Sequence, residues 1–205
     1  SNWSHADEYF APPAIGSLAT VDPAGIVQAP VGLEIGYVPI VTKQEKTPVK
    51  VRVFVLAGQS NMEGFGTIND PENDPGSLID VIQNDMEGNW SEIGEAGNWN
   101  SLEGASLYFA NNGDTIRTNV TVGQGNNPNL IGAELMFAHQ LDAYYDDPVL
   151  IIKTAWGGKS LAVDFRPPSA GGTTGSFYNT MIQTVQDVTQ NLETEFPDLG
   201  VTDFE

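Results

Sequence analysis

The sequence predicts an α/β protein, a three-layer sandwich in which a mainly parallel sheet lies between helices. Two apolar, β-rich segments, residues 51–57 and 149–154, have the character of strands buried on both faces. Between them, residues 129–145 carry apolar side chains at the helical period of about 3.6 residues. Because strand, helix and strand in that order form a parallel crossover, we expect the two strands to be neighbours and the helix to cross between them.

Residues 1–48 differ in composition from the rest of the chain. They contain six of the 13 prolines and no helical period, which is typical of an extended, irregular segment. We therefore predict an extended N-terminal segment or linker over residues 1–48 and the α/β domain over residues 49–205. The chain has neither an initiator Met nor a basic-then-apolar leader at its start, so we expect that any signal peptide was removed or lies outside this segment. A secreted or periplasmic location is the expectation that follows.

Charge and composition limit the partners. The 205 residues carry 27 acidic and 8 basic side chains, a formal net charge of -19. Nucleic acid and anionic membranes both require a basic face, so neither is expected as a partner. No apolar run approaches the roughly 18 residues of a membrane span. The absence of cysteine from the sequence excludes disulfides and thiolate metal sites.

The remaining elements follow in order along the chain. Residues 77–82 predict a short helix capped by Ser77, and residues 107–110 and 118–122 predict brief strands. We expect the helix over 129–145 to be capped by Asn129, and residues 176–196 to form a further amphipathic helix. The acidic residues 69–76 lack the spacing of a calcium loop, so no metal is expected. Trp90 and Trp99 are expected to pack in the protein rather than to bind sugar.

The segment that follows the first strand carries the chemistry. Residues 58–62 read Gly-Gln-Ser-Asn-Met, which places Ser60 in a tight turn at the strand's C-terminal end. Ligands bind at this edge of an open α/β sheet, so Ser60 is a candidate nucleophile. The alternative is a plain turn in which the serine caps a helix. The turn is not a G-x-S-x-G elbow, because Met62 stands where that motif has glycine.

These five residues resemble the first block of the SGNH-hydrolase superfamily, in the variant of carbohydrate esterase family 6 and the sialate O-acetylesterase-like proteins. The resemblance extends from Val51 towards the end of the chain, through residues 131–135 and 151–161. It implies an SGNH or flavodoxin-like sheet that lacks its C-terminal part here. It also implies a serine esterase, like a sialate O-acetylesterase or an acetylxylan esterase, that acts on acetylated carbohydrate through a Ser60 acyl-enzyme and needs no cofactor.

The second strand ends in a turn with two adjacent glycines, Gly157 and Gly158. A backbone N–H beside a glycine can point at an oxyanion. By resemblance, Gly158 supplies this donor, with Gly157 as the second choice and the Ser60 amide as the other donor. The alternative is that the glycines only allow a tight corner. A phosphate-binding P-loop is excluded, because Lys153 stands where that motif requires glycine.

A group of polar residues near these two turns is predicted to line the rim of the site. The predicted substrate-binding residues are Gln59, Asn61, Lys159, Asp164 and Arg166. The basic members could orient a substrate hydroxyl or carboxylate. The alternative is that Lys153, Lys159 and Arg166 form internal ion pairs with nearby aspartates.

A serine nucleophile also requires a base, and the sequence offers only His5 and His139. We do not expect His139 to serve, because it falls in the middle of the predicted helix. The resemblance implies a histidine from an Asp-x-x-His pattern and a third block of the Gln-Gly-Glu type, and these 205 residues contain neither. Weak esterase activity is therefore expected of this segment. The alternative function is a non-catalytic carbohydrate-binding or structural module on the same fold.

Overall fold

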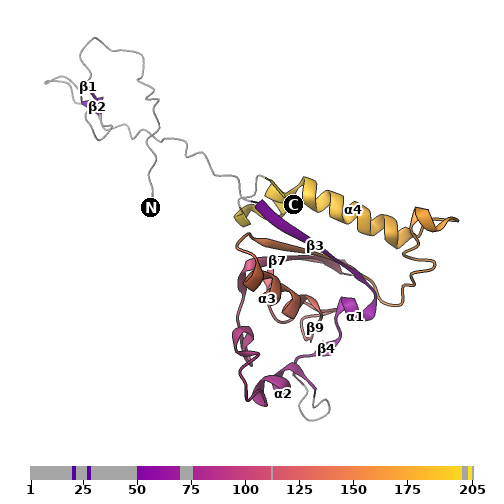
Figure 1. The fold of residues 1–205 in the computed structure, drawn as a ribbon, viewed down its shortest axis with the longest axis horizontal. Helices are drawn as coiled ribbons and strands as arrows, with labels where there is room; N and C mark the ends of the chain where they lie inside the picture. Colours follow the sequence, from indigo (N-terminus) through magenta and orange to yellow (C-terminus); the bar gives the residue numbers. More distant parts are fainter. Residues whose placement is uncertain are drawn as a thin grey trace. The chain divides into compact units, whose positions relative to one another are not determined.

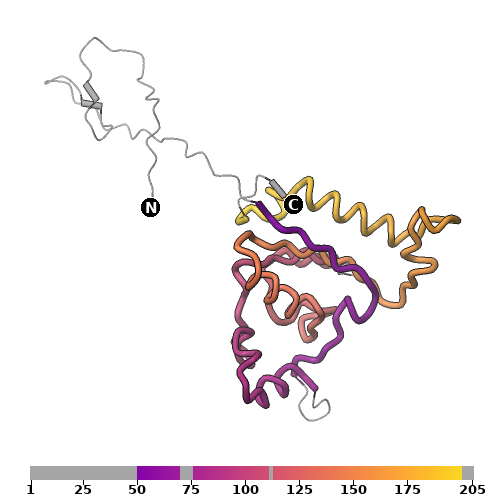
Figure 2. Tube along the Cα trace, in the orientation of Figure 1, coloured from indigo at the N-terminus to yellow at the C-terminus, as the bar shows by residue number. Residues whose placement is uncertain are grey.

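The computed structural model describes residues 20–21, 27–28, 50–69, 76–111, 113–199 and 203–204 (Figures 1 and 2). The chain divides into two units, Ser1–Thr47 and Pro48–Glu205. In the first unit β1 (Thr20–Val21) pairs antiparallel with β2 (Val27–Gln28). The rest of the predicted N-terminal segment lies outside the described residues, and so does most of the acidic stretch at 69–76.

The second unit is built on a mixed, mostly parallel sheet. Its strands are, in spatial order, β11 (Asp203–Phe204), β3 (Lys50–Gly58), β10 (Val149–Ala155), β7 (Leu102–Asn111) and β8 (Asp114–Val120). Only β8 runs antiparallel to its neighbour within this described sheet. The parallel pairing of β3 with β10 confirms the prediction for the two apolar segments, and the α/β fold class is confirmed with it.

The connection between β3 and β10 contains a hairpin as well as the predicted helix. After β3 the chain first forms the β7–β8 hairpin. The helix that precedes β10 therefore follows β8 and does not connect β3 to β10 directly. β7 pairs with the edge of β10 that faces away from β3, and Val149 lies opposite Ala105 there. The hairpin therefore extends the sheet beyond β10.

The brief strand predicted at 107–110 lies inside β7, which begins earlier, at Leu102. The strand predicted at 118–122 is correct only in part, because β8 begins at Asp114 and ends at Val120.

Helices cover both faces of the sheet. They are α1 (Ser60–Glu63), α2 (Leu78–Gln83), α3 (Glu134–Tyr144), α4 (Ser176–Gln190) and α5 (Leu192–Glu195). Shorter elements are the 3-10 turns η1 (Ser91–Ile93), η2 (Pro168–Ala170) and η3 (Pro197–Leu199) and the antiparallel pairs β4 (Gly66–Thr67) with β9 (Leu130–Ile131) and β5 (Gly94–Glu95) with β6 (Asn98–Trp99). In the described part of the chain, no helix has the length and apolar character needed to cross a membrane.

Two helix boundaries differ from the sequence prediction. The helix expected from Asn129 begins only at Glu134, because β9 pairs with β4 and so holds the preceding residues extended. The helix expected over 176–196 is interrupted at Asn191, which separates α4 from α5. The predicted cap of α2 is correct, since the Ser77 side chain accepts a hydrogen bond from the Asp80 amide at 3.4 Å.

The sheet separates two hydrophobic cores. Figure 1 shows α3 against one face and α4 against the other. All seven residues of β10 are buried, and successive side chains point to opposite faces. The core under α3 contains Phe109, Leu135, Val149 and Ile151, with Trp90 and Trp99 packed against it, as predicted for the two tryptophans. The core under α4 and α5 contains Leu150, Ile152, Val188 and Leu192. Each such aliphatic side chain contributes about 1.5–3 kcal/mol through burial, so β10 is the best anchored strand that reaches the site.

Candidate active site

The register between β3 and β10 brings two turns to one edge of the sheet. Gly58, the last residue of β3, lies opposite Ala155, the last residue of β10. The amide of Trp156 then donates to the Gly58 carbonyl at 3.1 Å, so the pairing continues one residue into the turn. The turn that leads into α1 and the turn that contains Gly157 therefore leave the sheet side by side. This is the edge at which open α/β sheets bind ligands.

Ser60 is the first residue of α1 and does not cap it. The cap position is held by Gln59, whose carbonyl accepts from the amides of Met62 (2.9 Å) and Glu63 (2.8 Å). The half-buried Ser60 hydroxyl makes no hydrogen bond to a residue that the structure describes. The alternative of a serine N-cap is therefore wrong. Gly58 allows the tight turn, since a Cβ there would lie 2.8 Å from the Met62 Cβ.

The two glycines of the β10 turn are required for different reasons. Gly158 has φ +71°, a left-handed conformation that disfavours other residues, and a Cβ there would meet no atom within 4 Å. Gly157 has no such conformation, but a Cβ on it would lie 3.0 Å from the Glu63 Oε2 atom. The backbone of both residues is exposed at the edge.

Glu63 was not singled out by the sequence analysis. Its side chain is 3% exposed, and its Oε1 atom accepts from the Asn126 amide at 2.6 Å. Its Oε2 atom is buried without a hydrogen-bond partner among the described residues. The sequence contains no signal for this arrangement, because only the fold places Asn126 and Gly157 next to Glu63.

Lys153 is buried inside the protein and does not reach the rim. Its ammonium donates to Glu134 Oε2 at 2.7 Å and to the Gln124 carbonyl at 3.2 Å, and it lies 4.2 Å from the Phe109 ring centroid. Burial lowers the pKa of Lys153 from its ordinary value of 10.5, against the raising effects of Glu134 and, more weakly, Glu63. The internal ion pair weighed from the sequence exists, but its acid is a glutamate on α3 and not a nearby aspartate.

Asp164 and Arg166 organise the loop between β10 and α4. Asp164 Oδ2 accepts from the Ser160 amide at 2.8 Å and from the Ser160 hydroxyl at 3.2 Å. The pKa of Asp164 is lowered from 3.8, chiefly by the hydrogen bond from the Ser160 amide. Desolvation, the next largest effect, raises it, whereas the Ser160 hydroxyl and the charge of Lys159 lower it further. Arg166 donates to three main-chain carbonyls, those of Ala162, Ala170 and Gly171. Both side chains therefore hold the loop in shape.

Lys159 is held by an aromatic ring. Its ammonium lies 4.6 Å from the ring centroid of Phe177, which belongs to α4. That ring packs in turn against Trp156 and Phe165, with centroid distances of 5.0 and 6.3 Å. No described carboxylate forms a salt bridge with Lys159. Of the predicted basic rim residues, Lys159 is thus the one whose charged group is not bound to main-chain carbonyls.

Histidine does not meet Ser60 in the described structure. His139 is 8% exposed on α3, and its Nδ1 atom lies 3.8 Å from Glu92 Oε2 of η1. No hydrogen bond joins it to any residue of α1 among those described. His5 lies outside the described residues.

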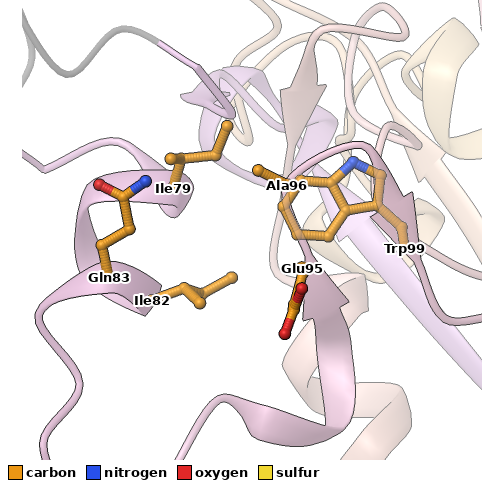
Figure 3. Close-up of a pocket in the computed structure, with 6 residues that line it drawn as sticks. All are labelled: Ile79, Ile82, Gln83, Glu95, Ala96 and Trp99. Atoms are coloured by element: carbon orange, nitrogen blue, oxygen red, sulfur yellow. The ribbon is translucent and has the colours of Figure 1, made fainter.

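A separate hollow of about 330 Å³ lies between α2 and the β5–β6 hairpin. Figure 3 shows Ile79 and Ile82 of α2 facing the hairpin. Its lining residues are Ile79, Ile82, Gln83, Glu95, Ala96 and Trp99. None of them belongs to the turns at the ends of β3 and β10, so this hollow is distinct from the edge that carries Ser60.

Comparison with known proteins agrees with this architecture. Residues 50–196 match the family described as carbohydrate esterase, sialic acid-specific acetylesterase. The match takes in most of the chain, and the chain belongs to this family of carbohydrate esterases. The resemblance inferred from residues 58–62 is thereby confirmed.

Structure comparison adds a distant similarity. A protein from Arabidopsis thaliana, solved by X-ray diffraction, is 14% identical, with a TM-score of 0.38 over 70% of this chain and 52% of that one. The chain thus spans about half the length of that protein. No curated protein sequence matches this chain.

Proposed function

We propose that this protein is a serine esterase that removes O-acetyl groups from carbohydrate through an acyl-enzyme on Ser60. One observation carries the proposal: the paired ends of β3 and β10 place the Ser60 turn beside the Gly157–Gly158 turn. Family membership supplies the class of reaction, hydrolysis of a carboxylic ester on a sugar.

The proposed reaction has two steps. Ser60 Oγ attacks the acetyl carbonyl carbon and gives a tetrahedral oxyanion, and the collapse of this intermediate breaks the bond to the sugar oxygen. The sugar leaves as an alcohol with the proton lost by Ser60. Water then attacks the acetyl-Ser60 ester, and acetate and the free serine are formed.

In this proposal the oxyanion is bound by backbone amides. Gly158 is the first choice of donor, Gly157 the second, and the amide of Ser60 completes the hole. Each such donor contributes roughly 3–4 kcal/mol to transition-state stabilisation. The exposure of the two glycines supports this assignment, because a ligand can approach the turn at that edge.

The proposed base is a histidine of the Asp-x-x-His pattern that the family resemblance implies. His139 is a poor candidate, since it is buried on α3 and its Nδ1 atom lies 3.8 Å from Glu92 of η1. His5 and His139 are preceded, three residues earlier, by Asn2 and Met136, so neither completes the pattern. A base outside the 205 residues is therefore part of the proposal.

The proposed substrate is an acetylated carbohydrate that contacts Gln59, Asn61 and Lys159. Gln59 and Asn61 are exposed beside Ser60, and their side chains make no hydrogen bond to described residues, so both can bind sugar hydroxyls. We propose that Asp164 and Arg166 support the shape of the substrate loop, because their polar groups already bind Ser160 and main-chain carbonyls.

The test is ester hydrolysis by the full-length protein and by its Ser60→Ala variant. Acetate release from a small acetyl ester and from O-acetylated sialic acid is expected, with a loss of about three powers of ten or more in Ser60→Ala. A full-length protein that binds acetylated sugar without turnover would favour the carbohydrate-binding module. The observation in favour of that second function is the absence of a histidine bonded to Ser60 among the described residues.

A further inference from the structure

Glu63 has an unusual environment for a carboxylate. It ends α1, three residues after Ser60, and is 3% exposed. One oxygen binds the Asn126 side chain, whereas the other is buried with no donor among the described residues. A buried acceptor without a partner is costly, so its presence calls for an explanation in terms of what the carboxylate does.

Charge pairing does not provide that explanation. The nearest buried cation is Lys153, and its ammonium is already bound to Glu134 and to the Gln124 carbonyl. Glu63 acts on Lys153 only through space. Two buried carboxylates therefore lie in the field of one ammonium. Only Glu134 bonds to it directly, and Glu63 does not.

The bonded oxygen fixes the loop that precedes β9. A carboxylate only accepts, so Asn126 must turn its NH₂ group towards Glu63 Oε1, at 2.6 Å. The Asn126 amide also donates to the Gly64 carbonyl at 2.9 Å, so this loop is attached to α1 by both backbone and side chain. The position of the loop thus follows the position of Glu63.

The unbonded oxygen faces the β10 turn. A Cβ on Gly157 would lie 3.0 Å from Oε2, a distance at which one of the two groups would have to shift. Since the other oxygen of the same carboxylate accepts from Asn126, a shift of Glu63 would disturb that hydrogen bond. Gly157 is therefore glycine because Glu63 occupies the space beside it.

We propose that Glu63 is a positioning residue of the esterase site, whose carboxylate sets the Gly157–Gly158 turn and the Asn126 loop relative to Ser60. The consequence for catalysis rests on the proposed function, because it requires that amides of this turn bind the oxyanion. The positional role itself does not, and it can be measured separately.

Glu63→Gln is the sharpest variant, since it keeps the shape and removes the charge. The new amide introduces N–H donors at a place that now only accepts, and Asn126 is no longer restricted to one orientation. We expect kcat to fall about tenfold with KM changed less than about twofold, as for loss of a transition-state interaction. Thermal unfolding should be unchanged or raised, because a buried charge without a bonded cation is removed. The matched control is Glu103→Gln, at an exposed glutamate of β7.

A double-mutant cycle tests the contact between Glu63 and Gly157. Gly157→Ala alone should lower kcat by about 100-fold, whereas in a Glu63→Ala background the same change should cost less than about threefold, because the new methyl group then has space. Multiplicative losses in the double variant would overturn the proposal, since they would show that the two residues act independently.

Backbone NMR of the ¹⁵N-labelled full-length protein gives a readout that needs no activity. The amide resonances of Gly157 and Gly158 should move in Glu63→Gln and stay in place in Glu103→Gln. Unmoved glycine resonances in Glu63→Gln would overturn the proposal even if the enzyme is active. If the unaltered protein hydrolyses no acetyl ester but the glycine resonances move, the proposed function fails and the positional role of Glu63 stands.

Discussion

Lys153 Nζ lies 2.7 Å from Glu134 Oε2, and these side chains are 0% and 1% exposed. Glu134 is the first residue of α3, and its other oxygen accepts from the Gly132 amide at 2.9 Å. The Gln124 carbonyl accepts from the same ammonium. One buried cation thus connects β10 with α3 and with the loop before it, directly behind the edge that carries Ser60.

The first prediction concerns this ion pair. Lys153→Met should lower the free energy of unfolding by about 3–5 kcal/mol, because it leaves the Glu134 carboxylate buried without its cation. Replacing both partners, as in Lys153→Met with Glu134→Leu, should recover a large part of that loss. Urea unfolding measures both, with Lys159→Met as a lysine control near the surface. Equal stability of Lys153→Met and the unaltered protein would contradict the prediction.

Gly158 provides a prediction on backbone conformation. Gly158→Ala should cost about 1–2 kcal/mol, the usual penalty of a left-handed residue that carries a Cβ. Gly158→Asn should cost less, since asparagine adopts this conformation more readily, and it keeps the backbone amide. Thermal unfolding ranks the three proteins. If asparagine and alanine destabilise equally, the positive φ is not the reason for the glycine.

Lys159 is expected to affect the choice of substrate. Its ammonium rests on Phe177 with no described carboxylate in salt-bridge range, so it can bind an anionic group of a sugar acid. Lys159→Met keeps the contact with the ring and removes the charge. We expect KM to rise about fivefold to tenfold for acetyl esters of sugars that carry a carboxylate, the magnitude of one partly exposed ion pair.

The control for Lys159→Met is an acetylated neutral sugar, for which KM should be unchanged. Added salt should weaken binding of the acidic sugar to the unaltered protein and have little effect on the variant, because screening acts on exposed charges. A similar rise in KM for both substrates would show that Lys159 acts through the shape of the loop.

Asp164 predicts a dependence of stability on pH. Its pKa in the folded protein lies below 3.8, chiefly because the Ser160 amide binds the ionised form. A lowered pKa means that the unfolded chain binds the proton more readily than the folded protein does. Asp164 therefore contributes to the free energy of unfolding above its ordinary pKa, and this contribution is lost as pH falls through the pKa of the folded protein. Thermal unfolding between about pH 2 and 6 should therefore show a gap between the unaltered protein and Asp164→Asn that closes on acidification. A gap that is constant over this range would contradict the assignment.

Much of the fold was accessible from local patterns. The segments 51–57 and 149–154 are continuous apolar runs, and such runs form strands buried on both faces because each residue alternates between two covered sides. The parallel neighbours, the turn at Ser60 and the packing of Trp90 and Trp99 follow from these local signals. The family resemblance depends on residues 58–62, which are also contiguous.

Helix boundaries and charge partners were less accessible. The apolar period of residues 129–145 does not show that β9 pairs with β4 and delays α3 until Glu134, because that pairing joins residues distant in the sequence. Lys153 was weighed against nearby aspartates, yet its acid belongs to α3. Arg166 was predicted to line a substrate rim, and no pattern in the sequence indicated that it also binds the carbonyls of its own loop.

By itself the sequence determined that segments 51–57 and 149–154 are strands, that these two run parallel, and that a serine follows the first of them, since hydrophobic runs and turn residues act within a few positions of the chain. Only the tertiary structure decided what surrounds that serine. The placement of Glu63 against Gly157 and of Lys153 against Glu134 depends on the register of β3 with β10 and on where α3 begins. Such contacts arise where segments distant in sequence meet in a close-packed interior, and a local pattern carries no information about that meeting.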